Sequence, residues 1–230
     1  ESGYLMIPMV IGMMTASILS GRITSNTGKY KIFMICGTAL MLVSYFYLST
    51  LTYQWEIWQI SIGMVVMGLG LGQMMQTLTI ASQNAVEAKD IGVATSSATF
   101  FRQMGGTLGV AVFLSILFNN LADKKAQMIA GLGQAIQANP SLKTNPRNVE
   151  FFTSPNPAGM IQSDSSFLKR ISPELANPIK QAFAESASAV FFAAAFVVVG
   201  AFALSWFVKE IALRTKSGVQ EKAEQAAAMH

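Results

Sequence analysis

The sequence contains few charged residues for its length. Only 12% of its 230 residues are Asp, Glu, Lys or Arg, whereas soluble domains usually carry about 25%. Hydrophobic residues make up 52% of the chain, and its mean hydropathy is +0.42. This composition argues against an ordinary soluble domain and is typical of membrane proteins.

Cysteine and histidine are nearly absent. The single cysteine, Cys36, stands in an apolar run, and the single histidine, His230, is the last residue. A lone cysteine forms no internal disulfide, so we expect Cys36 to be buried in packing. Catalysis and metal binding need His, Cys or paired carboxylates within reach of one another. The sequence therefore predicts a protein that is not an enzyme and has no metal site or cofactor.

Basic residues exceed acidic ones only slightly. The chain has 16 Lys and Arg against 12 Asp and Glu, a formal net charge of +4. Because these residues form no cluster or stripe, nucleic acid is not a predicted partner. In a membrane protein the location of each charge is more informative than the sum.

Long apolar segments are abundant. A helix needs about 20 apolar residues to cross a bilayer, and the sequence has five such segments: Tyr4–Ser20, Lys31–Thr50, Trp58–Ile80, Ile91–Phe118 and Ala187–Val208. None of them contains Asp or Glu. Backbone groups in lipid must be satisfied within the segment, so we expect helices. The predicted fold is an all-α, polytopic membrane helix bundle in contact with the lipid bilayer.

These segments divide the chain into four parts. Residues 1–118 carry four transmembrane helices, 119–186 form a long external segment, 187–209 the last transmembrane helix, and 210–230 a tail. The external segment is polar and contains six of the seven prolines. We expect a helical extension of the fourth span and a turn region at 153–159. We also expect a helix with Ser172 as its cap and Pro173 at its first position.

The distribution of basic residues predicts the orientation. The loop after the first span carries Arg22, Lys29 and Lys31, the next loop has no Lys or Arg, and the tail after residue 208 has four. Basic residues accumulate in short cytoplasmic loops. We therefore expect a multi-pass protein of the cell inner (plasma) membrane, with a cytoplasmic tail and with 119–186 outside.

Two spans contain pairs of small residues at helical spacing. Gly68 and Gly72 form one pair, and Gly105 and Gly109 the other. The stretch "GLGLGQMMQ" is no dinucleotide-binding loop, because Gln73 occupies the place of a third glycine and no strand precedes it. Small residues four apart let helix backbones approach closely. We expect both pairs to be helix-packing surfaces.

Polar side chains also occur inside the spans. Arg102, next to Gln103, lies about 16 Å along a helix that begins at Ile91, where an Arg costs about 2.5–3.5 kcal/mol to insert. It is either a tether to a neighbouring helix or a charge in the substrate path, and no acid in these spans can pair with it. Gln73 and Gln76 have the same two interpretations, interhelical hydrogen bonding or lining of a path. Gln103 is predicted with them as a polar residue at the midplane or in the substrate path.

These motifs resemble a known family. The stretch "ASQNAVEAKDIGVATSSATFFRQMGGTLGVAVF" closely resembles the penultimate-helix region of the fourteen-helix drug:proton antiporters of the major facilitator superfamily, with matches at 83–86, 92–96 and 100–111. "GRITSNTGKYK" is similar to the second-half copy of the G-x-L-A-D-R-x-G-R-K cytoplasmic loop. It matches at Gly21, Arg22, Gly28 and Lys29 and departs where Ser25 and Asn26 stand.

The resemblance implies a function and a missing part. The five spans correspond to the carboxy-terminal part of such a transporter, so the amino-terminal helices of the same protein are expected partners and hold the proton-coupling acids. The implied function is multidrug efflux, the export of lipophilic or cationic compounds in exchange for protons, with drug resistance as its consequence. The alternative is a facilitator-type exporter of a specific lipid, siderophore or metabolite. A membrane scaffold that transports nothing is a third interpretation.

Overall fold

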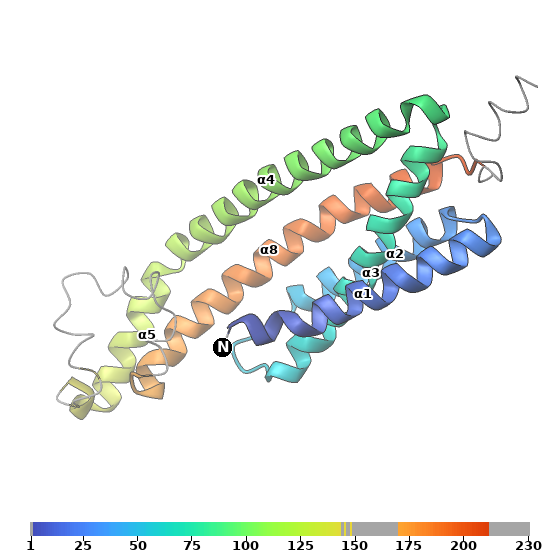
Figure 1. Cartoon of the computed structure of the whole chain (residues 1–230). Helices are drawn as coiled ribbons and strands as arrows, with labels where there is room; N and C mark the ends of the chain where they lie inside the picture. The colour runs from blue at the N-terminus through green and yellow to red at the C-terminus, as the bar shows by residue number, and fades with distance from the viewer. Residues whose placement is uncertain (1, 144, 146–147, 149–169, 212–230) are drawn as a thin grey trace, which may run out of the picture. The chain divides into compact units, whose positions relative to one another are not determined.

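The computed structural model describes residues 2–143, 145, 148 and 170–211. Six α-helices follow one another in this part of the chain (Figure 1): α1 (Ser2–Thr27), α2 (Lys31–Ser49), α3 (Ile57–Asn84), α4 (Ile91–Asp123), α5 (Lys125–Ala138) and α8 (Pro173–Phe207). The short 3-10 helices η1 (Ala88–Asp90) and η2 (Pro140–Lys143) complete it. No strand occurs in these residues. The turn region 153–159 and most of the tail lie outside them.

Five of these helices are long and apolar enough to cross a membrane: those within α1, α2, α3, α4 and α8. This confirms the predicted all-α polytopic bundle. The two longest helices are α4, with 33 residues, and α8, with 35, and both extend beyond the predicted spans Ile91–Phe118 and Ala187–Val208. Each measures about 50 Å by helical rise, whereas the hydrocarbon core is about 30 Å thick. Both helices are therefore several turns longer than is needed to cross the hydrocarbon core.

The chain divides into two compact units, which we describe separately. The first unit is made of described residues from Glu1–Ser49, Glu56–Phe113 and Phe191–His230. The second is made of described residues from Thr50–Trp55 and Leu114–Val190. In the first unit, α3 packs against both α1 and α2. Its buried side chains are mostly small, among them Ala16, Ser20, Thr24, Thr38 and Ser44.

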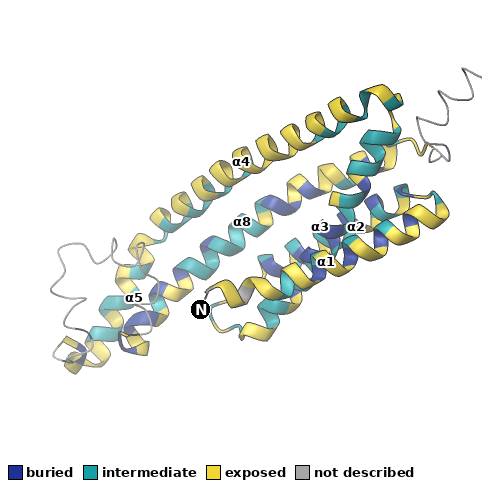
Figure 2. Ribbon diagram, in the orientation of Figure 1, coloured by how far each residue is buried: buried dark blue, intermediate teal, exposed yellow. Residues whose placement is uncertain are grey.

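Large apolar side chains of the first unit point outward. Ile18 is 58% exposed and Val43 61% (Figure 2). Lipid is as apolar as these side chains, so membrane helices associate through small residues and leave large ones outside. The same logic corrects our expectation for Cys36, which is exposed rather than buried. A thiol on a helix in lipid has no need of a protein partner.

The second unit has a core of the kind found in soluble domains. Leu142, Ile171, Leu175, Ala176 and Ile179 are buried together. They are covered by side chains of α5 and α8, namely Met128, Leu132, Ala135, Ile136 and Phe183. The sequence prediction of a helix starting at Pro173 is correct, and this helix continues without a break into the last span as α8. The fourth span is extended by α5, after a turn at Lys124.

A buried amide fastens the start of α8. Asn148 is fully buried, and its Nδ2 donates to the carbonyl of Leu142 (2.9 Å) and to Oγ of Ser172 (3.1 Å). Its Oδ1 accepts from the backbone N–H of Ser172 at 2.9 Å. The carbonyl of Ser172 in turn accepts from the N–H groups of Leu175 and Ala176. Because a buried amide costs free energy unless it is satisfied, these bonds make Asn148 a specific fastening point.

Candidate functional site

Backbone contact joins α1 to α3 at two predicted glycines. A Cβ added to Gly68 would lie 2.1 Å from the carbonyl oxygen of Met9, and one added to Gly72 would lie 2.2 Å from that of Met13. Gly12 on α1 is also in close contact, because a Cβ built on it would lie 2.6 Å from the carbonyl oxygen of Val65. No side chain fits at these distances without a shift of backbone. The two helices therefore touch main chain to main chain.

The other side of α3 contacts α2 in the same way. A Cβ built on Gly70 would lie 2.7 Å from the carbonyl oxygen of Gly37, and one built on Gly37 would lie 3.0 Å from that of Gly70. Ser44 donates from Oγ to the carbonyl of Gly63 at 2.7 Å. The sequence analysis missed these glycines. The available signal was the alternation in "GLGLG", which places glycine on both faces of a helix that lies between two neighbours.

Gln73 and Gln76 lie at different interfaces of α3. Gln76 lies against α1 at Gly21, where a Cβ would be 3.4 Å from its Nε2, and the Cβ of Gln73 would be 3.3 Å from one built on Gly37. Both residues are partly buried. Neither amide side chain forms a hydrogen bond to another residue in the described part of the chain. Unsatisfied amides inside a span are costly in lipid, so they need polar partners or water.

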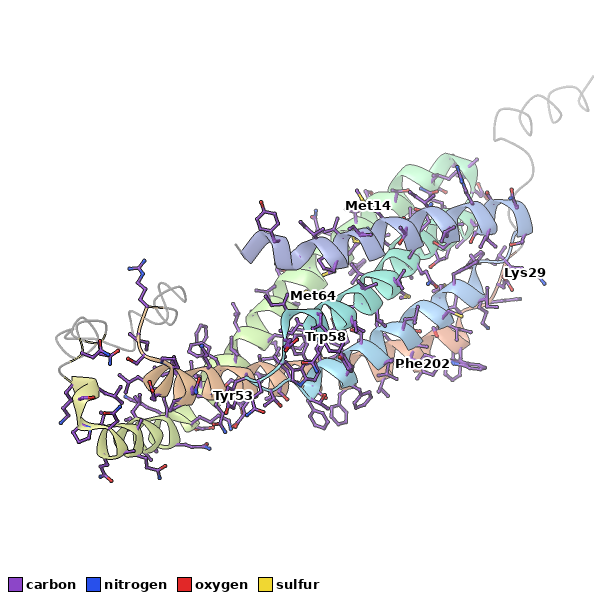
Figure 3. All side chains as sticks on the ribbon, turned by 90° about the horizontal axis from the view of Figure 1, so that it is seen from below. Met14, Lys29, Tyr53, Trp58, Met64 and Phe202 are labelled. Atoms are coloured by element: carbon purple, nitrogen blue, oxygen red, sulfur yellow. The ribbon has the colours of Figure 1, made fainter. Side chains whose placement is uncertain are left out.

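An apolar hollow lies beside the contact between Met13 of α1 and Gly72 of α3. It has a volume of about 320 Å³ and lies between α1 and α3, lined by Met13, Met14, Ser17, Ile18, Gly72 and Met75. Figure 3 marks Met14 on α1. Methionine is unbranched and polarisable, so a methionine-lined surface adapts to ligands of different shape. The sequence analysis noted the abundance of methionine but did not predict this cluster.

The α4 face with Arg102 has no neighbour in the described residues. Arg102 and Gln103 are both exposed, and no buried residue occurs anywhere along α4. No described atom lies within 4 Å of a Cβ built on Gly105 or Gly106, and Gly109 has only Phe113 of its own helix nearby, at 3.7 Å. Arg102 forms no hydrogen bond or ion pair with a described residue. The close-packing role of Gly105 and Gly109 stays a prediction.

The loop similar to the superfamily motif forms a tight corner between α1 and α2. Gly28 has a φ of +72°, which only glycine adopts readily, and its N–H donates to the carbonyl of Thr24 at 2.8 Å. Arg22 and Lys29 are exposed, and Figure 3 shows Lys29 projecting at this corner. Ser25, where the motif has Asp, donates back to the carbonyl of Arg22 at 2.8 Å. Its hydroxyl is thus turned to its own helix.

The same corner holds the end of α8. Tyr30 is 1% exposed, and its hydroxyl accepts from the N–H of Ile211 (3.0 Å) and donates to the carbonyl of Lys209 (3.4 Å). Lys31 Nζ donates to the carbonyl of Trp206 at 2.9 Å, where a cation satisfies the carboxyl end of a helix. Asn84, at the end of α3, donates to the carbonyl of Ile211 at 2.9 Å. We call the following residues the corner cluster: Tyr30, Lys31, Asn84, Trp206, Lys209 and Ile211.

The corner cluster was missed by sequence reasoning. Tyr30, Lys31 and Asn84 lie inside the two stretches quoted for the family resemblance, but their contacts are made to residues far along the chain. The cluster brings the ends of α1, α3 and α8 to one side, as five alternating spans require. We expect Tyr30→Phe to speed amide exchange of residues 208–211 by roughly fivefold, the effect of losing about 1 kcal/mol of hydrogen bonding. Hydrogen–deuterium exchange measures this.

A matched variant controls that measurement. Tyr4 is 77% exposed, so Tyr4→Phe removes a hydroxyl from the same unit and leaves the corner cluster intact. Exchange of residues 208–211 is expected to be unchanged in Tyr4→Phe. Equal exchange rates in Tyr30→Phe and the unmodified protein would show that the hydroxyl of Tyr30 does not hold the end of α8.

The chain is similar to known transporters over nearly its whole length. It is 36% identical over 212 residues to an uncharacterised MFS-type transporter of Mycobacterium tuberculosis, covering 92% of this chain and 28% of the relative. It is 30% identical over 240 residues to the multidrug transporter protein MdtP of Bacillus subtilis, covering 99% of this chain and 43% of the relative. A tetracycline resistance determinant of Streptomyces rimosus is 25% identical over 231 residues, covering 99% and 67% respectively.

Other comparisons found nothing. No protein-family model and no solved structure matches the chain. The chain spans about 28% of the length of the mycobacterial relative. Most of that relative therefore lies outside the aligned region. The chain is thus similar to MFS-type transporters, and its five long apolar helices form a polytopic membrane helix bundle.

Proposed function

We propose that the protein is a secondary active multidrug efflux transporter that exports lipophilic or cationic compounds in exchange for protons, and that this chain is its carboxy-terminal part. Efflux transport is supported by the relatives, which include a multidrug transporter and a tetracycline resistance determinant. Carriers of this kind consist of two halves that rock about a midplane site. The five spans then belong to the second half of a fourteen-helix carrier.

The observation that carries the proposal is the solitary charge in the apolar span of α4. Arg102 is exposed on a helix whose other membrane-embedded residues are uncharged, and an Arg does not face lipid at mid-depth without a large cost. The face of Arg102, Gly105 and Gly109 is therefore where the amino-terminal helices pack or where a polar path runs. Arg102 is then either a charge in that path or the tether of a neighbouring helix.

The substrate path also includes the interfaces of α3. Gln73 and Gln76 supply amide groups without protein partners in the described chain, and the hollow lined by Met13, Met14 and Met75 supplies an adaptable apolar surface. A pocket with a few polar groups on an apolar wall is the usual form of a small-molecule site. This combination suits lipophilic compounds of varied shape better than one specific metabolite.

The orientation follows from the basic loops. We place the corner cluster and the tail on the cytoplasmic side of the inner membrane, which puts residues 119–186 of this multi-pass protein outside. Lys29 and Arg22 are exposed at the corner, where positive residues are retained on the cytoplasmic side. The positive-inside rule and the contacts of the corner cluster agree, because both put the carboxyl ends of α1, α3 and α8 on the same side of the membrane.

Export by living cells tests the proposal. Cells that express the full-length protein are expected to accumulate several-fold less of a fluorescent lipophilic cation than cells with an empty vector. Collapse of the proton gradient with an uncoupler is expected to abolish the difference. Equal accumulation in both strains, with the protein present in the membrane, would contradict multidrug efflux and favour an exporter of one specific compound.

A further inference from the structure

A cleft outside the apolar spans has the size of a small-molecule site. It lies within the second unit, between α5 and the first turns of α8, and its volume is about 550 Å³. Ligand pockets have volumes of about 300–1,000 Å³. The two helices touch where a Cβ built on Gly131 would be 3.0 Å from the Cβ of Pro178. Small residues on either side of this contact, such as Ala130, Ala138 and Ala182, leave the cleft open.

The lining of the cleft combines apolar side chains with polar ones. Met128, Pro178 and Ala182 supply apolar surface, and the amides of Gln127, Gln134 and Gln181 supply hydrogen-bonding groups. Gln127 and Gln134 are exposed, and neither side chain bonds to another described residue. Each of these two amides therefore keeps two N–H donors and a carbonyl oxygen for a ligand.

One carboxylate gives the cleft its charge. Glu185 is the single charged residue among the described residues that line it. Its Oε1 accepts from Nε2 of Gln181 at 2.9 Å, and its Oε2 is paired with the ammonium group of Lys124. The side chain of Glu185 is 35% exposed and that of Lys124 27%. Because a carboxylate oxygen accepts about two hydrogen bonds, each oxygen of Glu185 has capacity for a further donor.

We propose that this cleft binds a small organic ammonium compound. The ammonium group donates to Glu185, the apolar body lies along Met128 and Pro178, and polar substituents bond to Gln127 and Gln134. Lys124 competes internally for the same carboxylate, so it sets the affinity. The site is separate from the residues of the proposed transport path, and binding here can fail while export stands.

Two variants that break the same ion pair test the proposal. The probe is dansylcadaverine, a fluorescent ring on a primary ammonium chain, titrated against the purified full-length protein with fluorescence anisotropy. Glu185→Gln removes the anion and is expected to weaken binding about tenfold, as loss of one partner of a charge pair does. Lys124→Met removes the competing ammonium group and is expected to strengthen binding about threefold. The effect is small because a partly exposed ion pair contributes little.

The opposite signs separate a site from a structural pair. If Lys124 and Glu185 only fasten the turn after α4 to α8, the two variants will change binding equally. Equal effects, or no saturable binding to the unmodified protein, would overturn the proposal. Glu174→Gln, which removes an exposed carboxylate from the first turn of α8, controls for net charge. Ala130→Trp fills the cleft with the ion pair intact, and it is expected to abolish binding even if Glu185→Gln fails to fold.

Discussion

Gly72→Ala is expected to separate α1 from α3 and to lower the free energy of unfolding by about 3 kcal/mol or more. Overpacking of a well-packed core typically costs 1–3 kcal/mol. Here the added methyl would lie 2.2 Å from the carbonyl oxygen of Met13, which is backbone and cannot rotate away. Thermal unfolding of the purified protein and its yield in the membrane both measure the effect.

Glycines without close neighbours provide the matched control. No described atom lies within 4 Å of a Cβ built on Gly200, in α8, or on Gly92, at the start of α4. Alanine also has the higher helix propensity, by up to about 1 kcal/mol. Gly200→Ala is therefore expected to leave the unfolding temperature unchanged or to raise it. A Gly72→Ala protein as stable as Gly200→Ala would show that α1 and α3 do not touch through their backbones.

Arg102→Ala is expected to reduce efflux at least about tenfold, the equivalent of about 1.4 kcal/mol lost from the transport cycle. Arg102 is the one charge in α4 between Ile91 and Phe118, so no neighbour on that helix replaces it. The alanine variant should insert normally, because insertion becomes less costly when the guanidinium is removed. Dye efflux, corrected for the amount of protein in the membrane, measures the loss.

Arg102→Lys distinguishes the two roles of this residue. Lysine keeps the charge but loses the planar fork with five N–H donors. If Arg102 tethers a neighbouring helix through several carbonyl or amide groups, Arg102→Lys should be as impaired as Arg102→Ala. If its charge acts in the substrate path, Arg102→Lys should keep most of the efflux. Full activity of the alanine variant would contradict both roles.

The architecture was predictable because membrane insertion depends on local composition. Segment length, the absence of acids and the positions of basic residues are properties of short stretches, and they predicted five spans near their observed bounds. The end of α1 was placed too early, because this helix continues to Thr27 rather than ending at Ser20. The last turns of α1 include Arg22 and Ser25 and are polar. They therefore lie beyond the apolar segment from which the span was predicted.

Contacts between distant residues were not predictable in the same way. The buried Asn148 and the corner cluster depend on groups that come together only in the folded chain, and Tyr30 and Lys209 are far apart in sequence. Gly68 and Gly72 were identified by their spacing, but the facing pair of Gly37 and Gly70 belongs to two helices. Such cross-helix pairs require the helices to be placed first.

Proton-driven export is the central claim, and inverted membrane vesicles measure it most directly. Vesicles that contain the full-length protein are given a fluorescent lipophilic cation, with and without an imposed proton gradient that is acidic inside. We predict uptake that requires the gradient, stops with an uncoupler and falls in Arg102→Ala vesicles. Uptake that is the same with and without the gradient, or no uptake above that of protein-free vesicles, would contradict the account.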